Sequence, residues 1–266
     1  MGGGRSGRGA GALFVVGIGP GAPEHLTGRA RELIGSCQTA IGYHTYLELI
    51  AEFLAGKEIL PYGMGQEEER CREALGRAAS GQRVCLVSGG DPGIYGMAGP
   101  ALECLRELAL EKRPRVEVVP GVPALSAAAS RLGAPLMNDF ATISLSDILT
   151  PWEKIESRLK HAALGDFVIV LYNPGSRTRR EQLGRAQKIL LSLLPGETPA
   201  GLVRGATRAG ELVRLTTLGE LPKEEVDMAT IIVIGNRSSF AFESYMVTPR
   251  GYSLGGAGGR TFGKKA

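Results

Sequence analysis

Arg83-Val-Cys-Leu-Val-Ser-Gly-Gly-Asp-Pro-Gly-Ile-Tyr-Gly96 is the segment of the sequence that decides the fold. It begins with an apolar run, passes through a glycine-rich turn, and is followed by a helical pattern over residues 97–110. A buried strand that leads directly into a helix is typical of a parallel α/β sheet, because helices cover both faces of such a sheet. Parallel sheets bind their ligands at the carboxyl ends of the strands. The segment therefore predicts both a fold class and the place of a binding site.

Strand-like and helix-like segments alternate along the rest of the chain. The predicted strands are 13–19, 39–41, 83–88, 116–119, 141–145, 167–172, 199–203, 211–218 and 230–235. The predicted helices are 26–37, 43–54, 66–79, 97–110, 122–132, 152–163 and 178–194. Residues 211–218 alternate polar and apolar side chains, which indicates a half-exposed antiparallel strand. We therefore expect an α/β protein of two lobes, with a mostly parallel N-terminal sheet and a mixed C-terminal sheet.

The two lobes are expected to span residues 12–120 and 121–252, with a hinge near Pro120 to Pro123. Residues 1–11 hold glycine, arginine and serine with no apolar run, and residues 253–266 are similar. We expect these ends to be a disordered leader and a flexible tail. Much of the formal net charge of +4 lies in them, so nucleic-acid binding is not expected.

The composition is that of an ordinary globular protein, with 266 residues, 43% hydrophobic and 22% charged. No stretch approaches the ~20 apolar residues of a membrane helix, and the N-terminus has no secretory signal. The four cysteines show neither CxxC nor zinc-finger spacing; they are Cys37, Cys71, Cys85 and Cys104. We expect free, mostly buried thiols, no metal site, no membrane contact and a cytoplasmic location.

A second glycine turn, Gly17-Ile-Gly-Pro-Gly-Ala22, follows the first predicted strand and matches the dinucleotide pattern GxGxxG/A. Pro20 lacks the N–H that should help to cradle a pyrophosphate. The next strand ends in Ile41-Gly-Tyr-His44, which offers no acidic residue to a ribose. Three interpretations stay open: a nicotinamide-dinucleotide site, a sharp turn that needs positive φ, and a loop shaped for the close approach of a bulky ligand.

In the turn around Asp91, the glycines Gly89, Gly90 and Gly93 would let a ligand touch bare backbone. Asp91 could cap the following helix, or accept hydrogen bonds from a ligand hydroxyl or ammonium group. A third turn, Pro120-Gly-Val-Pro-Ala-Leu-Ser-Ala-Ala-Ala129, leads a strand into a helix of small residues. Small residues allow close approach of either another element or a flat ligand.

In this order and at these intervals, the three turns resemble those of the tetrapyrrole methylases, the two-lobed class that includes uroporphyrinogen-III and precorrin methyltransferases. They correspond to the family's GxGPG, GGDP and PGV segments, here Gly17 to Gly21, Gly89 to Pro92 and Pro120 to Val122. Three longer runs are similar to the subgroup of precorrin-3B C17-methyltransferases. These runs are Ile143-Ser-Leu-Ser-Asp-Ile-Leu-Thr-Pro-Trp-Glu153, Leu171-Tyr-Asn-Pro174 with the arginines after it, and Val247-Thr-Pro-Arg-Gly-Tyr252.

The resemblance implies an enzyme of cobalamin biosynthesis. It implies transfer of a methyl group from S-adenosylmethionine to C17 of precorrin-3B, or of its cobalt-containing counterpart, coupled to contraction of the macrocycle. It also implies an active site in the cleft between two lobes, a large acidic tetrapyrrole as substrate, and a homodimer. The sequence leaves open whether the substrate carries cobalt.

The resemblance places cofactor contacts on Pro20, Gly89, Gly90, Asp91, Ile94, Pro123, Ala124, Tyr172 and Ala206. Expected substrate contacts are Gly17, Gly19, Gly21, Tyr43, Asn173, Arg177 and Arg204. Ring contraction also needs a general base and a partner for the developing oxyanion. Candidates for these roles are Asp91, His44, Asp147, Ser144 and Tyr95. The family often has Thr or Ser where this chain has Pro123, so that contact would lack a side-chain donor.

Several arginines fall at or near the predicted strand ends of the second lobe. They are Arg177, Arg179, Arg180, Arg204 and Arg208. A guanidinium group matches a carboxylate in a bidentate way, so the set makes an acidic ligand plausible. Alternatively, these side chains form a solvated helix face.

Three other functions compete with C17 methylation. The same fold could methylate a different precorrin carbon, although the run from Ser144 to Glu153 argues against it. The Gly17 turn could serve an NAD-dependent oxidoreductase. The chain could also be a catalytically idle ligand-binding module.

Overall fold

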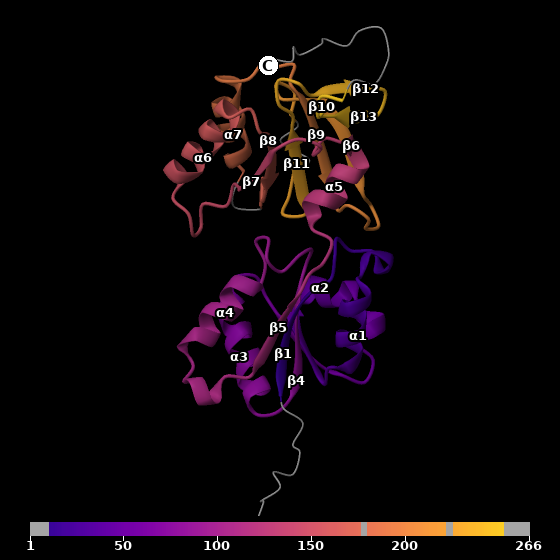
Figure 1. Cartoon of the computed structure of the whole chain (residues 1–266), viewed down its shortest axis with the longest axis vertical. Coiled ribbons are helices and arrows are strands. Elements are labelled where there is room, and N and C mark those ends of the chain that lie inside the picture. The colour runs from indigo at the N-terminus through magenta and orange to yellow at the C-terminus, as the bar shows by residue number, and fades with distance from the viewer. Residues whose placement is uncertain (1–10, 177–179, 222–225, 253–266) are drawn as a thin grey trace, which may run out of the picture. The chain divides into compact units, whose positions relative to one another are not determined.

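The computed structural model describes residues 11–176, 180–221 and 226–252. It divides into two compact units, Met1–Ala127 with Gly205–Glu211, and Ala128–Arg204 with Leu212–Ala266. The first unit is therefore discontinuous in sequence, because a short segment from the second half of the chain belongs to it. Each unit contains a five-stranded sheet covered by helices (Figure 1).

The sheet of the first unit is parallel throughout. Its strands are β1 (Ala12–Gly17), β2 (Thr39–Tyr43), β3 (Glu58–Tyr62), β4 (Arg83–Ser88) and β5 (Arg115–Val119), in the order β3-β2-β4-β1-β5. The expected parallel sheet is thus confirmed. The sequence missed β3, an edge strand that is largely exposed and contains Pro61. Proline is tolerated at an edge because no neighbouring strand needs its missing N–H there.

Helices cover both faces of this sheet. They are α1 (Gly28–Ser36), α2 (His44–Leu49), α3 (Glu67–Ala79) and α4 (Ala98–Glu107), with short 3₁₀ turns η1 (Pro23–His25), η2 (Ala51–Phe53) and η3 (Leu110–Lys112). Helices α3 and α4 lie on one side and α1 and α2 on the other (Figure 1). Leu13 and Val15 of β1 share a core with α3 and α4, whereas Phe14 and Val16 share one with α1 and α2. This alternation buries β1 completely, as a strand covered on two faces requires.

The single helix predicted over residues 43–54 is wrong. Helix α2 ends at Leu49, Ile50 has φ −119° and ψ 18°, and η2 follows. The apolar residues of α2 and of the segment around η2 pack in the same core. The sequence pattern therefore resembles that of one longer amphipathic helix.

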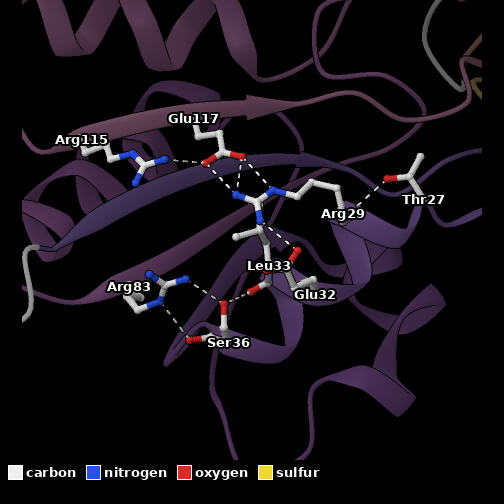
Figure 2. Close-up of polar contacts among 9 residues, drawn as sticks. Thr27, Arg29, Glu32, Leu33, Ser36, Arg83, Arg115 and Glu117 are labelled. Carbon is white, nitrogen blue, oxygen red and sulfur yellow. Dashed lines mark hydrogen bonds and ion pairs between the residues drawn. The ribbon is translucent and has the colours of Figure 1, made fainter.

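A polar network joins α1 to the edge strand β5. The guanidinium of Arg29 donates to both carboxylate oxygens of Glu117, at 2.7 to 3.0 Å, and to Glu32 at 2.9 Å. Arg115 reaches the same Glu117 carboxylate at 3.1 Å (Figure 2). These side chains are partly exposed, so the network orients the helix more than it stabilises the fold.

The sheet of the second unit is mixed, as expected. Its strands are β7 (Phe140–Ser144), β8 (Val168–Tyr172), β9 (Pro199–Arg204), β10 (Leu212–Thr217) and β11 (Thr230–Ile234), in the order β10-β9-β11-β8-β7. Only β7 and β8 pair in parallel. The half-exposed strand predicted near residues 211–218 is confirmed as the antiparallel edge strand β10.

Helices α6 (Trp152–Leu164) and α7 (Gln182–Leu191) pack with the sheet in one core. Helix α5 (Ala124–Leu132) lies on the other side (Figure 1), where Gly201 makes room for Leu132. The sequence predicted a longer helix in place of α7, over 178–194, and residues 177–179 lie outside the described part of the chain. A third sheet was not predicted; it consists of β6 (Gly133–Ala134), β12 (Phe240–Phe242) and β13 (Tyr245–Val247), all too short for a periodic signal.

All four cysteines are free and buried, which confirms that expectation. In the part of the chain that the structure describes, no helix combines the length and apolar character needed to span a membrane.

Candidate active site

Three glycine turns meet at the carboxyl ends of β1, β4 and β5. The turn after β1 and the turn after β4 form an antiparallel bridge, in which Gly90 N–H donates to the Gly19 carbonyl at 2.8 Å and Gly19 N–H donates to the Gly90 carbonyl at 3.2 Å. The sequence predicted a site at this edge, and the structure brings these two turns into direct contact.

Asp91 ties the second turn to the third. One carboxylate oxygen accepts the Gly93 N–H at 2.8 Å, and the other accepts the Gly121 N–H at 3.1 Å. The alternative that Asp91 caps a helix is wrong, because α4 begins only at Ala98 and its N-cap is Met97. Asp91 therefore holds two loops in register, and its predicted role toward a ligand stays a prediction.

The glycines of these turns are required for different reasons. A Cβ at Gly17 would lie 2.6 Å from the Gly90 carbonyl oxygen and 2.7 Å from the Gly121 nitrogen. A Cβ at Gly89 would lie 2.6 Å from the Tyr46 ring. Gly90 is different, because its φ is +62° and its nearest neighbour would be Ala124 N at 3.5 Å. Close packing explains Gly17 and Gly89 without a ligand, whereas backbone conformation explains Gly90.

The segment Gly205–Glu211 of the first unit packs on the Gly17 turn. Thr207 Oγ1 accepts the Ala22 N–H at 3.2 Å, and Arg208 Nε donates to the Pro20 carbonyl at 2.7 Å. The stem of Arg208 lies against Gly21, where a Cβ would be 2.5 Å from Arg208 Cγ. The predicted cofactor residue Ala206 belongs to this segment, which we call the 205–211 loop.

These contacts bear on the dinucleotide interpretation of the Gly17 turn. Of the four N–H groups between Ile18 and Ala22, three already donate within the protein, to Ser88, Gly90 and Thr207. The next α-helix starts at Gly28 and is capped by Thr27, whose Oγ1 accepts the Ala30 N–H at 3.2 Å. A dinucleotide fingerprint needs free amides and a helix N-terminus at the turn, and both requirements disagree with this geometry.

Tyr95, in the same loop as Asp91, has an unusual backbone. Its φ is +52° and its side chain is exposed. A bulky residue in the left-handed region costs about 1 kcal/mol or more, and such strain concentrates at functional sites. Ile94, beside it, is half-buried. Both stay candidates for contact with a ligand.

An aromatic cluster follows β2. The Tyr43 ring lies 4.4 Å from His44 and 5.4 Å from Tyr46, centroid to centroid. His44 begins α2, is exposed, and places Nδ1 3.8 Å from the Glu48 carboxylate. Burial raises the pKa of Tyr46, and the positive charge of Arg208 opposes this shift. The sequence did not single out Tyr46, because its contact with Gly89 joins distant segments.

In the second unit, polar residues gather at the carboxyl ends of β7 and β8. Asn173, at φ +53°, donates from Nδ2 to Ser144 Oγ at 2.9 Å, and Ser146 N–H donates to the same oxygen at 3.2 Å. Gln182 Nε2 donates to Asp147 at 3.0 Å. The structure thus brings Ser144 and Asn173 together and gives Asp147 a partner that the sequence did not reveal.

The remaining predicted residues fall as follows. Pro123 and Ala124 are half-buried beside Gly90, and Tyr172 is buried at the end of β8. Arg204 is half-buried at the end of β9. Arg177 and Arg179 lie outside the described residues.

Comparison with known proteins gives one consistent likeness. The sequence model described as Tetrapyrrole (Corrin/Porphyrin) Methylases matches residues 12–222. The chain is 48% identical over 244 residues to the cobalt-factor III methyltransferase of Priestia megaterium, across 91% of this chain and 45% of that protein. It therefore spans less than half the length of that relative.

Two further relatives are matched over nearly their full length. The probable cobalt-factor III C(17)-methyltransferase of Salmonella typhimurium is 45% identical over 242 residues, across 91% of this chain and 100% of that protein. The precorrin-3B C(17)-methyltransferase of Sinorhizobium sp is 41% identical over 250 residues, across 91% and 98%.

Solved structures agree. The crystal structure of the methyltransferase CobJ matches with a TM-score of 0.86 and 34% identity, across 90% of this chain and 100% of that one. A uroporphyrin-III C-methyltransferase from Thermus thermophilus, complexed with S-adenyl homocysteine, matches with a TM-score of 0.63 and 26% identity, across 85% and 92%.

Proposed function

Because the chain belongs to the tetrapyrrole methylase family, we propose that it methylates C17 of an acidic tetrapyrrole in cobalamin biosynthesis and couples this to ring contraction. The methyl donor is S-adenosylmethionine, and the substrate is cobalt-factor III or precorrin-3B. The observation that carries the proposal is the full-length match to a C17-methyltransferase together with the three joined glycine turns. The two relatives of higher identity carry the cobalt form in their names, which favours the cobalt-containing substrate.

The joined turns fit a cofactor of this kind. Gly90, Pro123 and Ala124 are half-buried neighbours, and a Cβ on Gly90 would only reach ordinary van der Waals contact with the other two. Asp91 fixes this surface through two backbone N–H groups, so little reorganisation is needed when a ligand arrives. S-adenosylmethionine, when bound, supplies a methyl group on a sulfonium. The residues proposed to hold it are Pro20, Gly89, Gly90, Asp91, Ile94, Pro123, Ala124, Tyr172 and Ala206.

Ser144 and Asp147 are proposed to move protons during ring contraction. Ser144 Oγ accepts two hydrogen bonds, from Asn173 and from Ser146 N–H, so its own O–H is left to donate. A donor held in this way can stabilise a developing oxyanion. One oxygen of Asp147 is held by Gln182, and the carboxylate can accept a hydroxyl proton. His44 and Tyr95 stay alternative candidates.

The residues proposed to contact the substrate are Gly17, Gly19, Gly21, Tyr43, Asn173 and Arg204. Arg177, which lies outside the described residues, is proposed for the same role. We further propose a homodimer in the cytoplasm. Light scattering of the purified protein tests the dimer, and fractionation of cells tests the location.

The reaction is tested with purified protein, methyl-labelled S-adenosylmethionine and either cobalt-factor III or precorrin-3B. Label in a ring-contracted product is the expected result. Label in an uncontracted product means that another carbon is methylated. Tight binding of a nicotinamide dinucleotide without methyl transfer would overturn the proposal.

A further inference from the structure

Helix α3 begins shortly after β3 ends, and its first turn carries Arg70. Arg70 is only 3% exposed. Its Nη2 donates to Glu67 at 2.7 Å, yet the Glu67 side chain is itself 41% exposed. Arg70 Nε is buried and has no hydrogen-bond partner among the described residues. The guanidinium is therefore buried, charged and only partly satisfied.

Stability does not explain this arginine. Burying a charge is unfavourable unless its hydrogen bonds are complete, and an apolar residue of similar volume is often as good or better. The other buried positions of α3 carry apolar residues, namely Cys71, Ala74, Leu75 and Ala78. A buried guanidinium with an unsatisfied donor therefore needs another explanation, and binding of a ligand is one such explanation.

The surroundings of Arg70 form part of the candidate site. Tyr43 and Tyr62 are register partners at the ends of β2 and β3. The Tyr46 ring lies 5.4 Å from the Tyr43 ring and packs against Gly89. Burial raises the pKa of both Tyr46 and Tyr62, and the charge of Arg70 is near enough to oppose both shifts. Arg70 is thus close enough to Tyr46 and Tyr62 to act on them, and Tyr46 contacts the glycine turn at Gly89.

We propose that Arg70 binds a carboxylate of the ligand in the candidate site, and that this carboxylate is an acidic side arm of the macrocyclic substrate. The identity of the ligand rests on the proposed function. A guanidinium offers a planar fork of donors that a carboxylate matches, and Nε is the donor left without a partner. The partly exposed Glu67 carboxylate orients the Arg70 guanidinium in the absence of the substrate. The carboxylate of the cofactor's amino-acid part is the competing source.

The test compares Arg70→Met and Arg70→Lys with the control Arg72→Met. Arg72 lies on the same helix, but its side chain is 51% exposed and pairs with Glu68 and Glu107. Uroporphyrin, a stable tetrapyrrole with eight carboxylates, is titrated by absorbance. S-adenosylhomocysteine is titrated by calorimetry, and thermal melting reports folding.

For Arg70→Met we expect the Kd for uroporphyrin to rise about 10-fold or more, because a charge-assisted pair is lost. The Kd for S-adenosylhomocysteine and the Tm should not worsen. Arg70→Lys keeps the positive charge but loses the planar set of donors, so its Kd for uroporphyrin should lie between those of the wild type and Arg70→Met. Arg72→Met should bind uroporphyrin like the wild type.

Equal uroporphyrin affinity in wild type and Arg70→Met would overturn the inference, as would a wild type that does not bind uroporphyrin. A weaker Kd for S-adenosylhomocysteine alone would assign Arg70 to the cofactor instead. A lower Tm with unchanged affinities would make the pair with Glu67 structural. Methyl transfer by the wild type is measured separately, so these outcomes leave the proposed function to its own experiment.

Discussion

At the scale of single residues, Asp91 and Gly89 show how the loops of the candidate site are held in place. Asp91 joins two loops that are 30 residues apart in the chain. Gly89 admits the ring of Tyr46. Both positions stand out in the sequence, but the partners that explain them do not.

Substituting Asp91→Asn should lower stability by about 1–2 kcal/mol, because one loop N–H then faces an amide NH₂ instead of a carboxylate oxygen. Affinity for S-adenosylhomocysteine should fall with it, since the loops lose their register. Urea unfolding and calorimetry measure the two effects. Asp139→Asn, at an exposed position in the second unit, is the control. Unchanged affinity in Asp91→Asn would contradict the proposed role.

Gly89→Ala should destabilise the protein by roughly 1–3 kcal/mol, because the new methyl group meets the Tyr46 ring. Repeating the change in a Tyr46→Ala background separates two explanations. If the glycine serves only the tyrosine, the penalty disappears in the double variant. If a ligand also contacts the backbone at Gly89, the double variant loses the stability penalty of Gly89→Ala but still binds S-adenosylhomocysteine weakly. This is the outcome we expect.

Sequence reasoning predicted the glycine turns at the strand ends and missed the contacts that distant segments make with them. Glycine turns after apolar strands predicted the meeting of three loops. Thr207 and Arg208 reach the Gly17 turn from 185 and 188 residues away. Nothing in the local pattern Gly-Ala-Thr-Arg indicates that contact, because only the folded chain creates it.

At the scale of elements, most strands were predicted, whereas β3 and β6 were missed. Strand β4 is apolar and buried, so periodicity identified it with its bounds. Strand β3 is exposed and holds Pro61, and β6 has two residues, so neither leaves a recognisable pattern. The break at Ile50 was hidden because α2 and η2 share a core.

The start of α1 offers a test of local stability that should leave binding alone. Thr27→Ala removes the cap that Oγ1 provides to Ala30 N–H and should cost about 1 kcal/mol. Thr27→Ser keeps the hydroxyl and should retain most of the stability. Denaturant unfolding measures both variants, and a loss as large in Thr27→Ser would contradict capping.

At the scale of the whole molecule, several buried groups should make the fold sensitive to alkali. Burial raises the pKa of Cys71 from 9.0 to about 12, and burial also raises the pKa of Cys104, Tyr46 and Tyr62. As pH rises, the unfolded chain releases these protons first, so stability falls with pH. For Cys71 the window runs from about pH 9 to about pH 12.

At pH 11, Cys71 should lower the free energy of unfolding by roughly 2–3 kcal/mol relative to neutral pH, since each pKa unit corresponds to about 1.4 kcal/mol. Urea midpoints at a series of pH values from neutral to pH 11 measure the fall. Cys71→Ala should make the pH dependence shallower, whatever its effect at neutral pH. A midpoint that stays constant into the alkaline range would contradict the burial of an un-ionised thiol.

The 205–211 loop has a consequence for recombination between related genes. The chain crosses from one unit to the other after Ala127, after Arg204 and after Glu211. A chimera with a single crossover near the middle would unite the Pro20 carbonyl of one parent with the arginine of another. A functional chimera should therefore take the 205–211 loop from the same parent as the amino-terminal part, or be built from parents that share the sequence of this loop.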